Sequence, residues 1–338
     1  MKKTIIVFLM TGVLASGAFA QITFSGSAYA GIQLRNPDGA DETINTFHRE
    51  EGSPMFNLTG TVLRDNFGAR LDTTFQATAD PHTHFSLNGI YGWVDFDGFS
   101  DNDSFRLTMG KMSNPAWATN LDARLPTHSL DEITGFRVEY NTPIQGLSVG
   151  IAFESTNYDV QTFFEQMIFG ATFIHPLFIA VFAYDLGDNG QAIFGFNYIG
   201  VPDLVLGMQL RAGNLASWDN ELMHFGTLLM HQKVGYRITR SIFAYLILGQ
   251  GIFGSEHVDT FLEFTPGVDI RFTPNLLGSF RLTVDSSDHF TTTNLTLNPM
   301  LEYSLRGPAV LYLEYSLRLD DMDRATHTLG FGITIRAF

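Results

Sequence analysis

The sequence predicts an all-β protein, a closed antiparallel transmembrane β-barrel of about 18 strands. Three observations predict it: apolar and polar residues alternate along many segments, short and long polar connectors alternate between those segments, and charge is sparse. The 338 residues include 31 Phe, 11 Tyr and 32 Gly, whereas charged residues make up only 16%. A soluble acidic protein of this length normally carries more charge. Apolar residues at helical spacing are rare here, and a period of two dominates.

The first 20 residues are predicted to be a signal peptide, so that residues 21–338 form one barrel domain. Lys2 and Lys3 give a positive start, a mostly apolar stretch covers residues 5–14, and Ala-Phe-Ala at 18–20 supplies the small residues that signal peptidase recognises. The apolar stretch is short for a bilayer span, and a retained anchor helix is the alternative. The segment predicts export.

The alternation that defines the strands is clearest near the C-terminus. Every odd position from Leu311 to Leu319 is leucine or tyrosine, while Glu314 and Arg318 lie at even positions. Strands of about ten residues with this pattern suit a barrel wall, with one face in lipid, the other in water, and every backbone group paired. A soluble β-sandwich or a small soluble barrel, the alternative, would place charge on its outward face. The same split recurs over residues 22–33, 147–154 and 204–211.

One segment, residues 168–184, resembles a membrane helix by hydropathy alone. His175-Pro176 lies in its middle, and each half is rich in β-branched and aromatic residues that alternate. We therefore predict two strands joined by a tight turn.

The connectors support the same architecture, because barrels of this kind have short turns at one end and longer loops at the other. Nine hairpins predict 18 strands, and 16 is the alternative because weak strands are easily misjudged. Short turns are predicted at 64–67, 97–103, 141–146, 175–176, 200–203, 238–241, 273–275 and 306–308. Longer loops are predicted at 35–53, 79–85, 113–132, 154–165, 185–190, 213–224, 251–257, 285–294 and 320–324.

The N-terminal part of the chain resembles the general porins of Gram-negative outer membranes over about residues 22–116. The resemblance implies an outer-membrane channel for passive diffusion of small polar solutes or ions, with outer-membrane lipid around it and a homotrimer as its assembly. It rests on the order and spacing of ITFSG (22–26), AGI (30–32), MFNLTG (55–60), DNFG (65–68), YGWV (91–94), FRLTMGK (105–111) and NPA (114–116).

The resemblance also implies that loop 113–132 folds into the lumen and sets the size of the pore. Opposed acidic and basic side chains would create a transverse field that favours polar solutes. The alternative is a surface loop with solvated charges. The loop candidates for the constriction are Trp117, Asp122, Arg124, Asp131 and Glu132. The strand candidates, which the alternation puts on the water side, are Arg70, Asp72, Arg106, Arg137 and Glu139.

Charge and composition bound the other functions. Removing Lys2 and Lys3 from the 20 basic residues leaves 18 against 35 acidic ones. No nucleic-acid partner is predicted, because phosphate binding needs clustered positive charge. The acidic excess along the later strands predicts a mild cation preference. No cofactor, metal or catalytic site is predicted: there is no cysteine, His82 and His84 lie in a polar loop, and no Ser-His-carboxylate spacing indicates an enzyme.

Two other functions remain open at this stage. A sugar-specific channel needs aromatic side chains along the lumen, and Tyr29, Phe261 and Tyr312 have the parity for it. A non-conducting adhesin or structural surface barrel is the alternative from a different class, with a plugged pore and functional loops.

Overall fold

A single antiparallel sheet makes up the described part of the protein. The structure is a computed structural model, and within its described residues no helix is long and apolar enough to cross a membrane. It describes residues 21–37, 43–46, 55–77, 83–100, 102–112, 133–154, 167–186, 190–213, 228–254, 258–287, 292–305, 308–321 and 324–336. The strands are β1 (Gln21–Pro37), β2 (Thr43–Thr46), β3 (Met55–Arg64), β4 (Phe67–Ala77), β5 (Thr83–Asp97), β6 (Ser104–Met112), β7 (Ile133–Asn141), β8 (Leu147–Glu154), β9 (Met167–His175), β10 (Phe178–Asp185), β11 (Gln191–Tyr198), β12 (Leu204–Ala212), β13 (Leu228–Thr239), β14 (Ile242–Gly254), β15 (Val258–Thr273), β16 (Leu276–Ser287), β17 (Thr292–Ser304), β18 (Ala309–Asp320) and β19 (Arg324–Arg336).

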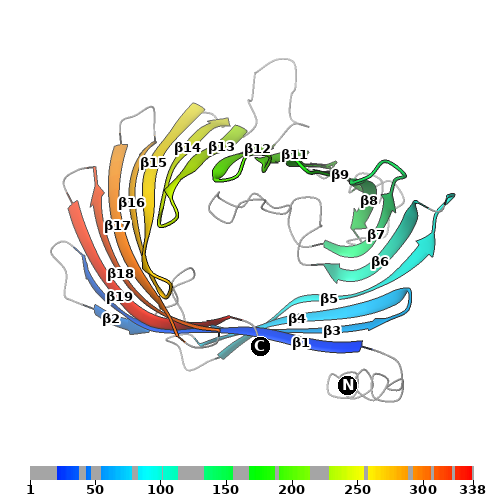
Figure 1. The fold of residues 1–338 in the computed structure, drawn as a ribbon, viewed down its shortest axis with the longest axis horizontal. Coiled ribbons are helices and arrows are strands. Elements are labelled where there is room, and N and C mark those ends of the chain that lie inside the picture. Colours follow the sequence, from blue (N-terminus) through cyan, green and yellow to red (C-terminus); the bar gives the residue numbers. More distant parts are fainter. Residues whose placement is uncertain are drawn as a thin grey trace.

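The sheet closes on itself, so no edge strand is left to pair with another chain. From β3 onward each strand pairs with the next along the chain, and β1 closes the ring by pairing with β19 from Ser27–Arg336 to Pro37–Thr326 (Figure 1). The short β2 and β3 share one position in the ring, because both pair with β1: β3 with Gln21–Tyr29 and β2 with residues 32–35. The ring therefore has 18 strand places. The predicted count is confirmed, and the alternative of 16 is wrong.

The predicted hairpins are confirmed where both strands are described. Segment 168–184 forms parts of β9 and β10 with a turn at Pro176-Leu177, and the register starts from the pair His175–Phe178. Three connectors contain an aspartate in the left-handed region: Asp65 with φ 48°, Asp203 with φ 69° and Asp321 with φ 51°. Aspartate tolerates that conformation better than most residues. Most residues of the predicted longer loops lie outside the described ranges.

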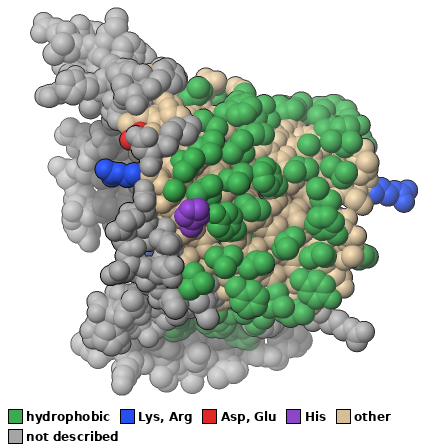
Figure 2. Space-filling view, turned by 90° about the vertical axis from the view of Figure 1, so that its left-hand side faces the viewer, with side chains coloured by type: hydrophobic (Ala, Val, Ile, Leu, Met, Phe, Trp, Pro, Cys, Tyr) green, Lys and Arg blue, Asp and Glu red, His purple; other side chains and the backbone are tan. Residues whose placement is uncertain are grey.

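The outer wall of the barrel is apolar. On β19, Leu329 and Phe331 are exposed while Gly330 and Gly332 between and beside them are buried. Figure 2 shows the face that carries the last strands: hydrophobic side chains cover it as a band, and Lys and Arg appear only towards its two ends. A wall that exposes large apolar side chains on strand after strand is suited to lipid.

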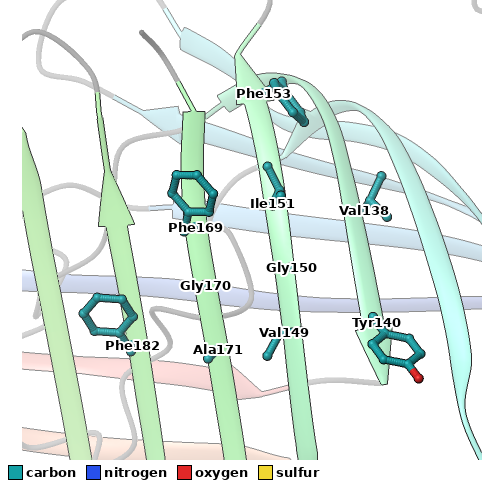
Figure 3. Close-up of a pocket in the computed structure, with 10 residues that line it drawn as sticks. All are labelled: Val138, Tyr140, Val149, Gly150, Ile151, Phe153, Phe169, Gly170, Ala171 and Phe182. Carbon is teal, nitrogen blue, oxygen red and sulfur yellow. The ribbon is translucent and has the colours of Figure 1, made fainter. Parts of the chain in front are cut away.

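A shallow apolar groove of about 590 Å³ runs across the outer wall of β7–β10. It lies where the paired residues Gly150 and Gly170 lack side chains and Ala171 has only a methyl group (Figure 3). Aromatic side chains from β8, β9 and β10, including Phe153, Phe169 and Phe182, stand around it.

The inner face of β8–β11 departs from the predicted alternation. Ile168, Val181, Ala183 and Ile193 point away from the lipid side and are at most 3% exposed. Here both faces of the strands are apolar, which explains why hydropathy alone could not separate this segment from a helix.

Candidate functional site

The five strand residues predicted to line the pore lie on three strands of one stretch of the wall. Arg70 and Asp72 belong to β4, Arg106 to β6, and Arg137 and Glu139 to β7; Arg106 and Glu139 are directly paired across the ladder. The adjacent Leu71 and Val138, and Met109 three residues after Arg106, are exposed on the outer wall. Because side chains alternate along a strand, the charged residues face the lumen.

Each of the three arginines is held by a carboxylate. Arg70 Nε donates to both oxygens of Asp72, at 3.0 and 2.8 Å. Arg106 Nε and Nη2 donate to the two oxygens of Asp95 on β5, at 2.6 and 2.9 Å. Arg137 Nη2 lies 2.8 Å from Glu139 Oε2. We call these six residues the arginine wall. Its formal charges cancel, so it presents fixed dipoles.

The three pairs differ in shielding. The side chains of Arg137 and Glu139 are only 10% and 14% exposed, whereas those of Arg106 and Asp95 are 42% and 36% exposed. The third pair is mixed: Asp72 is as shielded as Glu139, with 12% exposure, whereas Arg70 is 44% exposed. Asp72 also accepts a hydrogen bond of 2.6 Å from Thr59 Oγ1. A shielded pair interacts more strongly than an open one because less water screens it.

Aromatic side chains of β5 lie beside these charges. The guanidinium of Arg106 lies 5.6 Å from the centre of the Trp93 ring, within the range of a cation–π contact. Tyr91 is 6.0 Å from Trp93 and pairs directly with Arg70 across the ladder. The Trp93 ring lies against Gly68, where a Cβ would overlap it.

A second stretch of the lumen, on β13–β15, holds its cations differently. Lys233 Nζ lies 5.7 Å from the centre of the Tyr245 ring, and the Arg237 guanidinium lies 5.9 Å from that of Phe243. The two rings stack at 6.0 Å. We call these four residues the aromatic wall. Gly235 and Gly267 on the flanking strands make room, because a Cβ on either would overlap Phe243 or Tyr245.

The acidic residues of the later strands also face inward. Glu263 and Asp285 are directly paired between β15 and β16, and each accepts a side-chain hydrogen bond, from Thr265 at 2.7 Å and from Asn294 at 2.8 Å. Glu314 accepts one from Asn298 at 2.7 Å.

The sequence missed one member of the arginine wall, Asp95. Its signal was present, because Tyr91, Trp93 and Asp95 share the parity of the lumen side, but only the register with Arg106 reveals the ion pair. The loop candidates Trp117, Asp122, Arg124, Asp131 and Glu132 lie outside the described residues, as does His82.

The two described aromatic side chains that were considered for a sugar path are not brought together. Tyr312 on β18 is 2% exposed and lies against Gly332, whereas Phe261 on β15 lies near His231 of β13. The side chain of Tyr29 lies outside the described part. Among the described residues, no group of three or more His, Asp or Glu is placed to hold a metal.

A closed antiparallel barrel with an apolar outer wall and a charged inner wall is the architecture of outer-membrane porins. Comparison with solved structures finds this fold. OccK2 (OpdF) of Pseudomonas aeruginosa aligns with a TM-score of 0.63 at 13% identity, over 93% of this chain and 97% of that one. The anion-selective porin of Comamonas acidovorans aligns with a TM-score of 0.51 at 12% identity, over 94% and 100%.

Pseudomonas aeruginosa OpdK, solved with vanillate, aligns with a TM-score of 0.58 at 13% identity, over 93% of this chain and 98% of that one. No protein-family model and no curated protein matches by sequence. The expected likeness to Gram-negative porins is therefore confirmed for the fold, along nearly the whole chain rather than its first third.

Proposed function

We propose that the protein is an outer-membrane channel for passive diffusion of small polar solutes or ions. The observation that carries the proposal is the closed barrel of 18 strand places with apolar side chains outside and the three arginine–carboxylate pairs inside. The fold shared with porins supports the same function. A cleaved signal peptide at residues 1–20 would bring the chain to that membrane.

The arginine wall acts through its field. Side chains held at 2.6–3.0 Å from their partners keep charge separation at fixed positions on the lumen surface. Such a surface orders water and solvates polar solutes, while an apolar solute would have to displace that water without replacing its hydrogen bonds. The wall therefore favours small hydrophilic molecules without needing a specific binding pocket.

Loop 113–132 completes the constriction in this proposal, with its charged and bulky residues opposite the arginine wall. Deletion of residues 114–128 is expected to enlarge the single-channel current, because the narrowest part of the path would open. An unchanged current in the deletion variant, with folding intact, would reject the constriction.

A mild preference for cations follows from the acidic residues on the later strands. Glu263 and Asp285 accept hydrogen bonds from neutral donors, which leave their negative charge in place. The reversal potential in a salt gradient measures the preference, and an anion-selective value would overturn it.

The deciding experiment places the purified mature protein in a planar lipid bilayer. Stepwise conductance that falls as neutral sugars of graded size are added supports a diffusion channel and gives the size of its opening. Electrical silence of a protein that still shifts on a gel after boiling would contradict the channel and support a surface protein. Cross-linking and mass measurement test the trimer that the porin resemblance implies.

A further inference from the structure

Two glutamines face outward from the barrel wall, where a transmembrane protein presents apolar side chains. They are Gln232 on β13 and Gln250 on β14. At described outward-facing positions, no other amide or charged side chain lies more than two residues from a strand end. The pair is therefore an exception that needs a physical explanation.

Burial and register fix the direction of both side chains. On β13 the flanking His231 and Lys233 are 5% and 3% exposed on the lumen side, whereas Val234 is 51% exposed. Gln232 shares the parity of Val234. Gln250 is exposed between the buried Gly249 and Gly251.

The two amides are neighbours. Met230 on β13 pairs with Gln250 on β14, and Gln232 is the next outward residue after Met230 on the same strand. Apolar side chains of β12, β14 and β15 surround the pair, since Gln232 also pairs with Met208 and Leu248 and Gln250 pairs with Leu262. We call Met230, Gln232 and Gln250 the amide patch.

The amide patch lies within the apolar band. Gln232 is seven residues from the end of β13 at Thr239 and four from Leu228. At about 3.3 Å per residue and a tilt of about 40°, seven residues rise roughly 18 Å. Outward-facing Leu228 and Tyr236 lie on either side of it along the strand. By the same geometry the four residues to Leu228 rise roughly 10 Å, so a glutamine side chain reaches neither described end of the strand.

The described part of the chain gives these amides little to bind. Gln232 Nε2 is 3.3 Å from Met230 Sδ, a weak acceptor, and Gln250 makes no side-chain hydrogen bond to any described residue. An amide without a partner in hydrocarbon loses the hydrogen bonds that it had in water, which costs several kcal/mol. In membrane proteins such side chains commonly bond across a protein–protein contact.

We propose that the amide patch is a contact between two copies of this chain, related by a twofold axis along the membrane normal. All copies insert in the same direction, so such an axis brings equivalent residues together at equal depth. A carboxamide both donates and accepts, and the patch therefore complements itself. A ring of three copies would instead need a different surface to meet it, and the described outer wall offers no second amide or charged group at mid-depth.

The test uses the absence of cysteine from the chain. Met230→Cys places one thiol inside the patch and leaves both glutamines intact. A bismaleimide added to membranes that contain this variant is expected to give a covalent dimer. Phe75→Cys is the matched control, because Phe75 is 38% exposed on the outer wall of β4, eight residues from the turn-side end of its strand, as Met230 is nine from its own.

The outcomes separate the possibilities. Dimers at position 230 and monomers at 75 support the twofold contact. Monomers at both positions overturn the twofold contact, and a trimeric mass in detergent would then assign assembly to another face. Equal cross-linking at both positions also overturns it.

A second variant removes the amides alone. Gln232→Leu with Gln250→Leu in the Met230→Cys background is expected to weaken association roughly tenfold, or about 1.4 kcal/mol, at unchanged single-channel conductance. Unchanged cross-linking in that variant would overturn the role of the amides. Conductance is read separately, so failure of this contact leaves the channel proposal standing.

Discussion

The arginine wall and the aromatic wall are two solutions to the same problem, which is how to keep a cation in the lumen at a fixed position. On the arginine wall each guanidinium has a carboxylate within 3.0 Å, as in Arg106 with Asp95. On the aromatic wall Lys233 and Arg237 lie over the faces of Tyr245 and Phe243, and Arg237 Nε also lies 3.0 Å from Asp203 Oδ1. The first arrangement cancels charge and leaves dipoles, whereas the second covers one side of each cation with an aromatic ring.

The two walls also depend on different residues for their geometry. The arginine wall is fixed by ion pairs and hydrogen bonds between side chains. The aromatic wall is fixed by what is missing, because the rings occupy the space that side chains at Gly235 and Gly267 would take. Removing a charge should therefore disturb the arginine wall most, and adding side-chain volume should disturb the aromatic wall most.

The largest effect is expected for the most shielded ion pair. Arg137→Leu leaves Glu139 facing the lumen wall without its guanidinium, at 14% exposure. Breaking such a pair costs about 3–5 kcal/mol, whereas replacing both partners by apolar residues costs far less. We therefore expect the unfolding free energy, measured by guanidinium titration in lipid vesicles, to fall by about 3 kcal/mol and to recover in Arg137→Leu/Glu139→Leu.

The control for shielding is the open pair of the same wall. Arg106→Leu should cost roughly 1 kcal/mol or less, because Arg106 and Asp95 are both at least a third exposed and water screens their charges. Equal losses at positions 106 and 137 would show that shielding does not distinguish the pairs.

The second prediction tests the aromatic wall by volume. In Gly267→Ala the new Cβ overlaps the Tyr245 ring, so the ring must swing into the lumen. Overpacking of this kind costs about 1–3 kcal/mol, and a displaced ring should lower single-channel conductance. Tyr245→Ala in the same chain should restore the conductance by removing the displaced ring.

Gly92→Ala is the matched control for this substitution. A Cβ at Gly92 would come no closer than 3.4 Å to its nearest neighbour, the Gly68 carbonyl oxygen, which is ordinary contact. A conductance loss in Gly92→Ala as large as that in Gly267→Ala would show that the ring is not responsible.

The difference between the walls also marks how far the sequence could be interpreted. Alternation along each segment suffices for the barrel, the hairpins and the lumen side of Arg70, Asp72, Arg106, Arg137 and Glu139, because side-chain direction in a strand depends only on parity. The partner of Arg106 depends on register, which parity does not contain, so Asp95 was missed. The aromatic wall was missed for a related reason, since Gly235 and Gly267 acquire their role only beside Phe243 and Tyr245.

Alternation of apolar and polar residues also failed to predict two features of the fold. The short β2 lies within a segment predicted as a loop, because four residues are too few to show a period. Ile168 and Val181 face inward although they are apolar. Alternation assumes that every inward position meets water, and these buried positions do not.

The third prediction concerns the turn below the arginine wall, between β5 and β6. Asp103 accepts a 2.6 Å hydrogen bond from the Tyr140 hydroxyl and others from the backbone N–H groups of Ser100 and Phe99. These bonds, that from Tyr140 first, lower the pKa of Asp103 from 3.8 to about 2. The ionised group therefore stabilises the folded protein above about pH 4, and this contribution disappears as the pH falls from 4 towards 2.

Unfolding free energies measured between pH 5 and pH 2 test this turn. The wild-type protein should lose more stability over that interval than Asp103→Asn, whose amide does not titrate. Tyr140→Phe should fall between them, because it removes only the largest cause of the lowered pKa. Parallel curves for the wild-type protein and Asp103→Asn would contradict the assignment.

The smallest effect is expected at the corresponding turn of the aromatic wall, where Arg237 Nε lies 3.0 Å from Asp203 Oδ1. Both side chains are about half exposed, so the ion pair contributes well under 1 kcal/mol.

Asp203 has a second role, because its φ of 69° lies in the left-handed region. Asn accepts that conformation and Ala does so poorly, at a cost of about 1 kcal/mol. Asp203→Asn should therefore change the unfolding free energy less than Asp203→Ala does, and the difference should persist in high salt, which screens charges but not backbone strain. Equal losses that vanish in salt would assign this turn to the ion pair instead.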